Sequence, residues 1–111
     1  MKQIRIKCWV EDDGEKLFGP GPNELIKKIH KEGSLTKAAA VMNMSYKKAW
    51  DMIQRLNQNS EEPLVILKKG GYHGGGAEVT AHGLEVVAEY DKLEKEITDL
   101  INRQDLLKLL K

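Results

Sequence analysis

Hydrophobic residues alternate with polar ones along the first part of the chain, and the spacing then becomes helical. One face of the alternating segment carries Ile4, Ile6, Cys8 and Val10. Because this alternation leads into the turn signal Asp13-Gly14, residues 1–18 predict an N-terminal β-hairpin. The run GPGP at 19–22 ends this segment, and the next apolar residues, at helical spacing up to Gly33, are Leu25, Ile26 and Ile29.

Two short helices separated by a turn are predicted between residues 34 and 58. Ser34 and Ser45 stand where N-caps are expected, and Asn43 tolerates the left-handed conformation that ends a helix. The first helix presents Leu35, Ala38, Ala39 and Val41, and the second presents Tyr46, Ala49, Trp50, Ile53 and Leu56 on one expected buried stripe. Because so few residues separate them, the two helices must cross steeply, as in a helix-turn-helix.

Residues 64–80, LVILKKGGYHGGGAEVT, predict a second β-hairpin with a glycine-rich tip. Thr80 can then cap a final helix over residues 81–111. A heptad-like seam along this helix comprises Val86, Tyr90, Leu93, Ile97, Leu100, Gln104 and Leu107. A helix of roughly 30 residues would be about 45 Å long, more than so small a core can cover. We therefore expect a second copy of the chain to cover it, giving a homodimer.

The order of these elements predicts an α+β fold of the winged helix-turn-helix type. With 111 residues, the chain is expected to form one domain. Its expected parts are an N-terminal hairpin at 1–18, a helix and helix-turn-helix at 20–58, a wing at 64–80 and a dimerisation helix at 81–111.

Charge is concentrated on the helix-turn-helix, although the formal net charge of the chain is only +1. Between Lys27 and Arg55 there are 7 basic and 2 acidic residues. Lys47 and Lys48 begin the second helix of the motif, where the helix dipole favours acidic residues instead. A DNA duplex would supply the missing negative charge. The alternative is that Lys47 pairs with Asp51 four residues later on a solvated face, but the hairpin that follows favours DNA.

The position of each side chain on the predicted fold gives the candidate DNA contacts. The major groove is expected to meet Ser45, Tyr46, Lys47, Lys48, Asp51 and Gln54, and phosphates are expected to meet Arg55, Lys68, Lys69 and His73. Tyr46 and Trp50 could also stack on bases, but their place on the apolar stripe favours the core for both rings.

No catalytic, cofactor or metal site is predicted. Cys8 is the only cysteine, and the three histidines are too scattered to form a metal set. The glycine-rich segment lacks the Walker A spacing, and neither Ser34 nor Ser45 lies in a G-x-S-x-G elbow. No run of 18 apolar residues or signal peptide is found, so we expect a cytoplasmic protein with no membrane contact.

The segment GSLTKAAAVMNMSYKKAWDMIQRLN resembles the N-terminal DNA-binding domain of the ModE-type molybdate-responsive regulators. LFGPGPNELIKKI before it and GGYHGGGAEVTAHG after it extend the resemblance to about residues 15–92. The resemblance implies a homodimeric winged helix-turn-helix transcription factor, with Ser45, Tyr46, Lys47 and Lys48 at the start of the recognition helix.

The resemblance does not extend to the molybdate-binding portion, which follows the DNA-binding domain in full-length members of that family. This sequence ends at Lys111, so we expect no tight molybdate binding by these residues alone. The alternative function is a protein-interaction module that uses the winged scaffold and the long helix without binding DNA.

Overall fold

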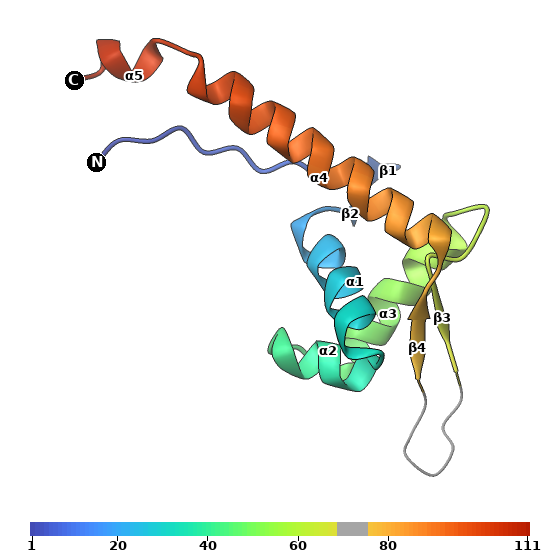
Figure 1. The fold of residues 1–111 in the computed structure, drawn as a ribbon. Coiled ribbons are helices and arrows are strands. Elements are labelled where there is room, and N and C mark those ends of the chain that lie inside the picture. Colours follow the sequence, from blue (N-terminus) through green and yellow to red (C-terminus); the bar gives the residue numbers. More distant parts are fainter. Residues whose placement is uncertain (69–75) are drawn as a thin grey trace.

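The computed structural model describes residues 1–68 and 76–111 and has the winged helix-turn-helix architecture (Figure 1). An N-terminal hairpin precedes three helices, which are followed by a second hairpin and a long helix. In chain order the elements are β1 (Val10–Asp12), β2 (Glu15–Phe18), α1 (Pro20–Glu32), α2 (Leu35–Val41), α3 (Tyr46–Gln58), β3 (Val65–Leu67), β4 (Ala77–Val79), α4 (Ala81–Asn102) and α5 (Leu106–Leu109). Both hairpins are antiparallel and form separate two-stranded sheets.

Local capping chemistry sets the helix boundaries, and the caps predicted from the sequence are confirmed. The hydroxyl of Ser34 accepts a hydrogen bond from the backbone N–H of Lys37, 3.2 Å away. Thr80 caps α4 in the same way through the backbone N–H of Gly83, at 2.9 Å. Gly33 ends α1 at φ 68°, and Asn43 takes φ 55° between α2 and α3. The turn between the two helices of the motif therefore has the predicted conformation.

The hydrophobic core lies where α1, α2 and α3 meet the base of the second hairpin. Three side chains of α1, those of Leu25, Ile26 and Ile29, have no exposed surface. The other buried apolar residues are Phe18, Leu35, Ala38, Ala39, Ala49, Ile53, Leu56, Leu64, Val65, Ala77, Val79, Val87 and Tyr90. The small alanines of α2 allow the close helix crossing that the motif requires.

The backbone around Leu64 joins α3, the second hairpin and α4. The side-chain oxygen of Asn57 accepts the N–H of Leu64 at 2.9 Å, and its NH₂ group donates to the carbonyl of Val65 at 2.9 Å. On the other side, the N–H of Thr80 donates to the Leu64 carbonyl at 2.9 Å. A Cβ atom at Gly83 would collide with that carbonyl oxygen, so α4 can begin this close only with glycine there.

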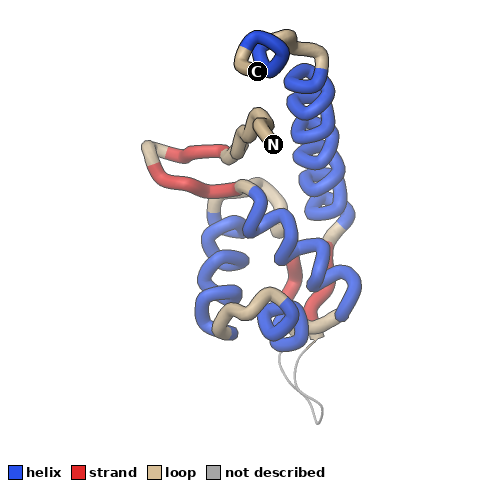
Figure 2. Tube along the Cα trace, turned by 90° about the vertical axis from the view of Figure 1, so that its left-hand side faces the viewer, coloured by secondary structure: helices blue, strands red, loops and turns tan. Residues whose placement is uncertain are grey.

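The predicted N-terminal strand is wrong for most of its length. β1 contains only Val10–Asp12, and residues 1–9 run in extended form beside α4 without strand pairing (Figure 1). The tight turn at Asp13-Gly14 pairs β1 with β2, and the GPGP run then begins α1. Residues before Val10 have no strand opposite them, so the expected alternation does not produce a longer hairpin. Figure 2 shows the segment and the short hairpin from a second direction.

The predicted single helix over 81–111 is also wrong, because α4 ends at Asn102 and α5 is a separate short helix. The backbone N–H groups of Arg103 and Gln104 donate to carbonyls three residues earlier, both at 3.2 Å. The Gln104 side chain donates to the Leu100 carbonyl at 3.0 Å. This bond satisfies one of the backbone carbonyl groups at the end of α4 that have no partner within the helix. Residues 102–106 are exposed, so no packing extends the helix through them.

Tyr90 belongs to the core of its own chain and not to the predicted seam. Its side chain is 5% exposed, and its ring meets that of Phe18 edge to face with centroids 5.2 Å apart. Its hydroxyl donates to the carbonyl of Cys8, which holds the N-terminal segment against α4. Burial, together with the charge of Glu94, raises the pKa of Tyr90 to about 12.

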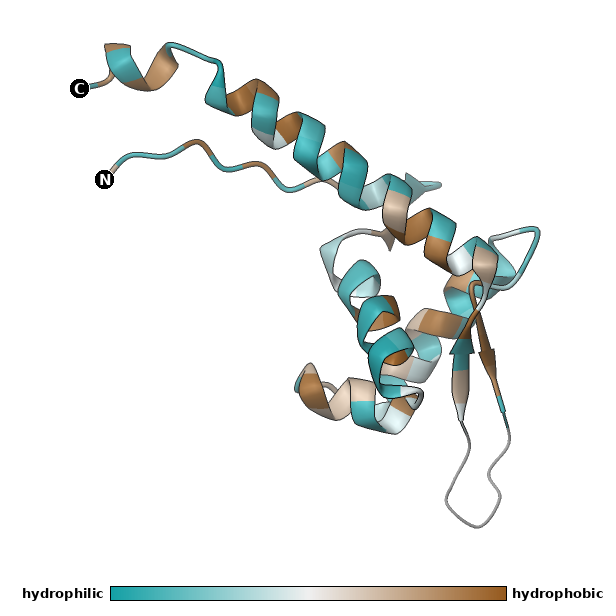
Figure 3. Cartoon of the chain, viewed as in Figure 1, coloured by the Kyte–Doolittle hydropathy of each residue, from teal (hydrophilic) through white to brown (hydrophobic). Residues whose placement is uncertain are grey.

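The molecule is elongated because α4 projects away from the helical core. Its extents are 60 × 29 × 24 Å, and apolar residues recur along α4 beyond the core (Figure 3). No helix in the part of the chain described by the structure is long and apolar enough to span a bilayer.

Candidate nucleic-acid interface

The start of α3 presents its two lysines to solvent. Ser45 caps the helix by accepting the backbone N–H of Lys48 at 3.1 Å, and the first turn contains no acidic residue. The Nζ of Lys47 lies 3.2 Å from a carboxylate oxygen of Asp51, so the i, i+4 pair considered as the alternative is present. The Lys47 side chain is nevertheless 83% exposed. An exposed pair of this kind is worth about 0–1 kcal/mol and leaves the ammonium group accessible to an anion.

Most of the predicted groove-contacting residues lie together around a shallow hollow of about 440 Å³ on α3. Its lining comprises Ser45, Lys47, Lys48, Asp51, Met52 and Arg55. Gln54, on the same helix, is half-buried. The hollow therefore combines ammonium, carboxylate and hydroxyl groups on the outward face of one helix, a set that can bind base edges and phosphates.

Arg55, predicted to contact phosphate, has partners within its own chain. Its guanidinium donates to the backbone carbonyl of Lys16 at 2.6 Å and to the carboxylate of Glu15 at 3.3 Å. These two bonds connect α3 to β2 across about 40 residues of sequence. Sequence patterns gave no signal for this contact, because it joins two exposed polar positions on different elements.

The second hairpin carries one predicted phosphate-contacting residue in the described part of the chain. The ammonium group of Lys68 lies 3.4 Å from the carboxylate of Glu78, and both side chains are 62% exposed. Lys69 and His73 lie outside the described residues. The start of β4 is held against the turn between α1 and α2, since the N–H of Ala77 donates to the carbonyl of Gly33 at 3.0 Å.

The prediction that Tyr46 and Trp50 are core residues is wrong. Their side chains are 53% and 41% exposed, whereas the buried stripe of α3 consists of Ala49, Ile53 and Leu56. Trp50 follows Ala49 directly and is therefore turned about 100° around the helix from it. The 3, 4 spacing gave the buried face correctly but not how far that face extends around the helix.

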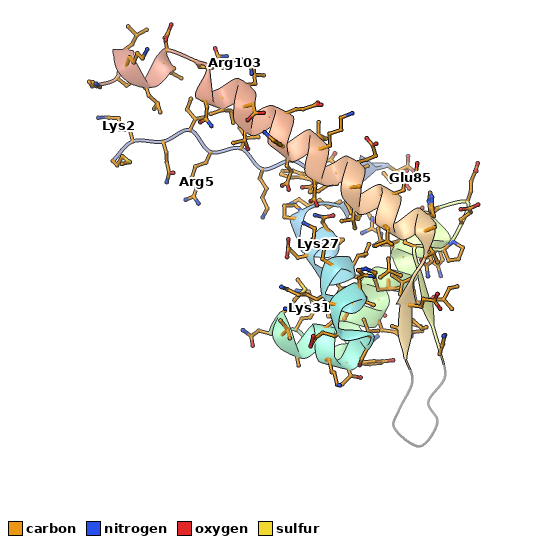
Figure 4. The ribbon with its side chains drawn as sticks, in the orientation of Figure 1. Lys2, Arg5, Lys27, Lys31, Glu85 and Arg103 are labelled. Atoms are coloured by element: carbon orange, nitrogen blue, oxygen red, sulfur yellow. The ribbon has the colours of Figure 1, made fainter. Side chains whose placement is uncertain are left out.

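A polar network that the sequence analysis missed connects α4 to α1. The buried amide of Asn23 donates to Asp91 at 2.9 Å, and the ammonium group of Lys27 lies 2.9 Å from the same oxygen. Figure 4 labels Lys27 on α1, between the helix-turn-helix and α4. The hydrogen bond that Lys27 donates to Asp91 raises the pKa of Lys27. Burial acts to raise the pKa of Asp91, but the hydrogen bonds from Lys27 and Asn23 outweigh it and lower that pKa.

No metal centre is found in the ranges 1–68 and 76–111. No group of three or more His, Cys, Asp or Glu side chains among these residues could hold a metal ion.

Comparison with known proteins identifies the family to which the chain belongs. Residues 24–84, which contain most of α1, the helix-turn-helix and the second hairpin, match the family model "Bacterial regulatory helix-turn-helix protein, lysR family". The chain is 43% identical over 79 residues to "Molybdenum transport protein ModE" of Azotobacter vinelandii, an alignment that covers 71% of this chain and 29% of the relative.

Two further relatives give the same result. "DNA-binding transcriptional dual regulator ModE" of Escherichia coli strain K12 is 37% identical over 99 residues, covering 86% of this chain and 38% of the relative. "Molybdenum-pterin-binding protein MopB" of Rhodobacter capsulatus is 36% identical over 78 residues, an alignment that covers 70% of this chain and 29% of the relative. The matched region is thus less than half of each of these relatives. The chain belongs to the bacterial regulatory helix-turn-helix proteins of the lysR family and is a ModE-like member of them.

Proposed function

We propose that this chain is a homodimeric, sequence-specific DNA-binding transcriptional regulator. In this proposal α3 enters the major groove from Ser45 onward, and the second hairpin acts as a wing along the phosphate backbone. The observation that carries it is the cationic first turn of α3, where the Lys47 side chain is 83% exposed and no acidic residue offsets the helix dipole. Lysine reads guanine through N7 and O6, so at least one G·C pair is expected in each half-site.

The contacts proposed for the groove and the backbone differ in what they contribute. Within the groove, Lys47, Lys48 and Asp51 provide the charged groups, with Ser45, Tyr46 and Gln54 beside them. Lys68, Lys69 and His73 of the wing, with Arg55, are assigned to phosphates, where they add affinity without sequence information. Arg55 would keep its bond to the Lys16 carbonyl and offer its remaining N–H groups to a phosphate oxygen.

Dimerisation is proposed through residues 81–111, with α5 as an addition to the seam. Leu93 and Leu100 of α4 are 43% and 52% exposed. Leu93 lines a groove of about 610 Å³ between α4, the N-terminal hairpin and the end of α3. The last residues add exposed side chains at Leu106 (52%), Leu109 (80%) and Leu110 (51%). So many exposed apolar side chains on α4, α5 and the residue after α5 support burial against a second copy.

Fluorescence anisotropy with duplex DNA from a random pool tests the DNA-binding proposal. If the dimer contacts 6–10 phosphates, its affinity should fall by about 10³- to 10⁵-fold between 50 and 200 mM salt. Selection from the same pool should return an inverted repeat with half-sites about one helical turn apart. The same affinity at both salt concentrations, or no binding at low salt, would contradict the proposal and leave the protein-interaction module as the remaining function.

The sensing function suggested by the relatives' names is not proposed for these 111 residues. Two of the relatives described above are named for molybdenum, but the alignments cover only 29% of each. We infer that residues 1–111 alone do not bind molybdate tightly. An increase of several degrees in melting temperature on adding molybdate would contradict this. A DNA-binding role also leads us to propose the cytoplasm as its location.

A further inference from the structure

Two large aromatic side chains lie exposed on the first two turns of α3. Tyr46 is 53% exposed and Trp50, four residues later, is 41% exposed. Side chains four residues apart are neighbours on a helix surface, so the two rings form one apolar patch. The core of the chain does not use this patch, since Ala49, Ile53 and Leu56 already supply the buried face of α3.

The patch lies on the flank of α3 that faces the second hairpin. Trp50 and Asn57 are seven residues apart, about two helical turns, and so share one side of the helix. Asn57 donates to Val65 and accepts from Leu64, which fixes that side against β3. The opposite flank carries Arg55, whose bonds go to β2. The rings therefore lie between the outward Lys47 and the second hairpin.

The charges beside the patch indicate what covers it. Lys47, about 60° around the helix from Trp50, is exposed in the same two turns, so an apolar protein surface docking here would have to bury its ammonium group, which is costly. The proposed dimer seam is elsewhere, because α4 lies against the far end of α3, as Leu56, Asn59 and Ser60 in its groove indicate (Figure 1). The molecule that covers the patch must therefore carry negative charge and also apolar groups that reach the two rings on the surface of α3.

A DNA major groove has this combination, because the 5-methyl group of thymine projects into it beside the phosphates. We propose that Trp50, with Tyr46 next to it, contacts thymine 5-methyl groups in each half-site and so determines part of the sequence specificity. This inference rests on the proposed DNA-binding function. It adds discrimination of T·A pairs, whereas the lysines read guanine.

Single replacement of each thymine by deoxyuridine in a selected duplex tests this directly. Deoxyuridine keeps the hydrogen-bonding groups of thymine and removes only the 5-methyl group. With the wild-type protein, we expect one or two thymines per half-site whose replacement weakens binding about fourfold. This is the loss of affinity expected when one methylene-sized group is no longer buried in the complex. If no replacement weakens binding by more than about 1.5-fold, the inference is wrong, while binding of the parent duplex leaves the proposed function intact.

The variant Trp50→Ala shows whether the methyl effect depends on this ring. In that variant, the deoxyuridine effect at the sensitive thymines should disappear, because the contact has already been removed. The control is Trp9→Ala, since Trp9 is 37% exposed on the N-terminal segment, outside the helix-turn-helix. That control should retain the fourfold effect. An undiminished effect in Trp50→Ala would contradict the inference.

A fluorescence measurement keeps the test decisive if Trp50→Ala fails to fold. The chain contains two tryptophans, Trp9 and Trp50, so Trp9→Phe leaves Trp50 as the only indole. Saturation with the selected duplex should shift the emission of Trp50 and reduce its quenching by acrylamide at least twofold. The matched variant Trp50→Phe, which reports on Trp9, should show neither change. Unchanged acrylamide quenching of Trp50 in the saturated complex would overturn the proposal.

Discussion

At the residue scale, hydroxyl side chains set where three helices begin, whereas tertiary contacts decide which aromatic rings are exposed. Ser34, Ser45 and Thr80 accept hydrogen bonds three residues ahead, and this chemistry depends only on neighbouring sequence. The exposure of Trp50 depends instead on how far the neighbouring elements extend around α3. The burial of Tyr90 likewise depends on its partners Phe18 and Cys8, which are distant in sequence.

Removing the Tyr90 hydroxyl tests the contact that holds the N-terminal segment. Tyr90→Phe keeps the ring against Phe18 but loses the bond to the Cys8 carbonyl, so we expect about 1 kcal/mol lower stability at pH 7. The pKa of Tyr90 is raised from 10.0 to about 12 in the folded chain, so its contribution is complete below pH 10 and is lost as pH rises towards 12.

Urea unfolding of both proteins at pH 8 and pH 11 checks this expectation. The difference in unfolding free energy between wild type and Tyr90→Phe should shrink at the higher pH, because ionisation removes the advantage of the hydroxyl. A difference that stays constant or widens would show that the hydroxyl is not buried as described.

At the element scale, the helices with both a capping residue and a buried face were predicted well, and the elements at the two ends of the chain were not. α1, α2 and α3 each have a cap or stop signal and pack in the core. Residues 1–9 and 103–111 have exposed or partly exposed side chains, so sequence alternation and heptad spacing there were not matched by packing within the chain. Their structure depends on contacts that the sequence pattern alone cannot specify.

The contact of α4 with α1 predicts how stability changes in acid. The pKa of Asp91 is lowered from 3.8 in the folded chain, so its contribution is present above that value and is lost as pH falls below it. Asp91→Asn should therefore be less stable than wild type at pH 6, and the difference should decrease towards pH 3. Because the Asp91 side chain is 41% exposed, we expect a modest effect.

Thermal unfolding between pH 6 and pH 3 provides the measurement, and Asp99→Asn is the control. Asp99 pairs with Lys95 at 3.0 Å within α4 alone, so its replacement breaks an ion pair without separating two elements. We expect a smaller loss at pH 6 in the control. An equal loss in both variants would mean that Asp91 does not connect α4 to α1.

At the scale of the whole molecule, the projecting α4 accounts for the elongated shape and supports dimerisation. Leu93 and Leu84 are similarly exposed, at 43% and 41%, but they lie nine residues apart, about two and a half turns, and so on opposite sides of the helix. Only Leu93 lines the groove. Leu93→Glu should give a monomer at micromolar concentration by light scattering, because it places a charge in the seam, while Leu84→Glu should remain a dimer. Two dimeric variants would contradict the proposed seam.

The affinity of Lys47→Ala/Lys48→Ala for the selected duplex tests the central claim most directly. The claim is that DNA supplies the negative charge that the cationic start of α3 lacks. The control is Lys95→Ala/Lys111→Ala, which removes the same charge and breaks an equivalent i, i+4 pair, Lys95–Asp99. We expect at least a 100-fold loss of affinity in the first variant, a loss below fivefold in the control, and nearly unchanged melting temperatures in both. Equal losses of affinity, or a melting temperature lowered by many degrees in the first variant only, would contradict the account.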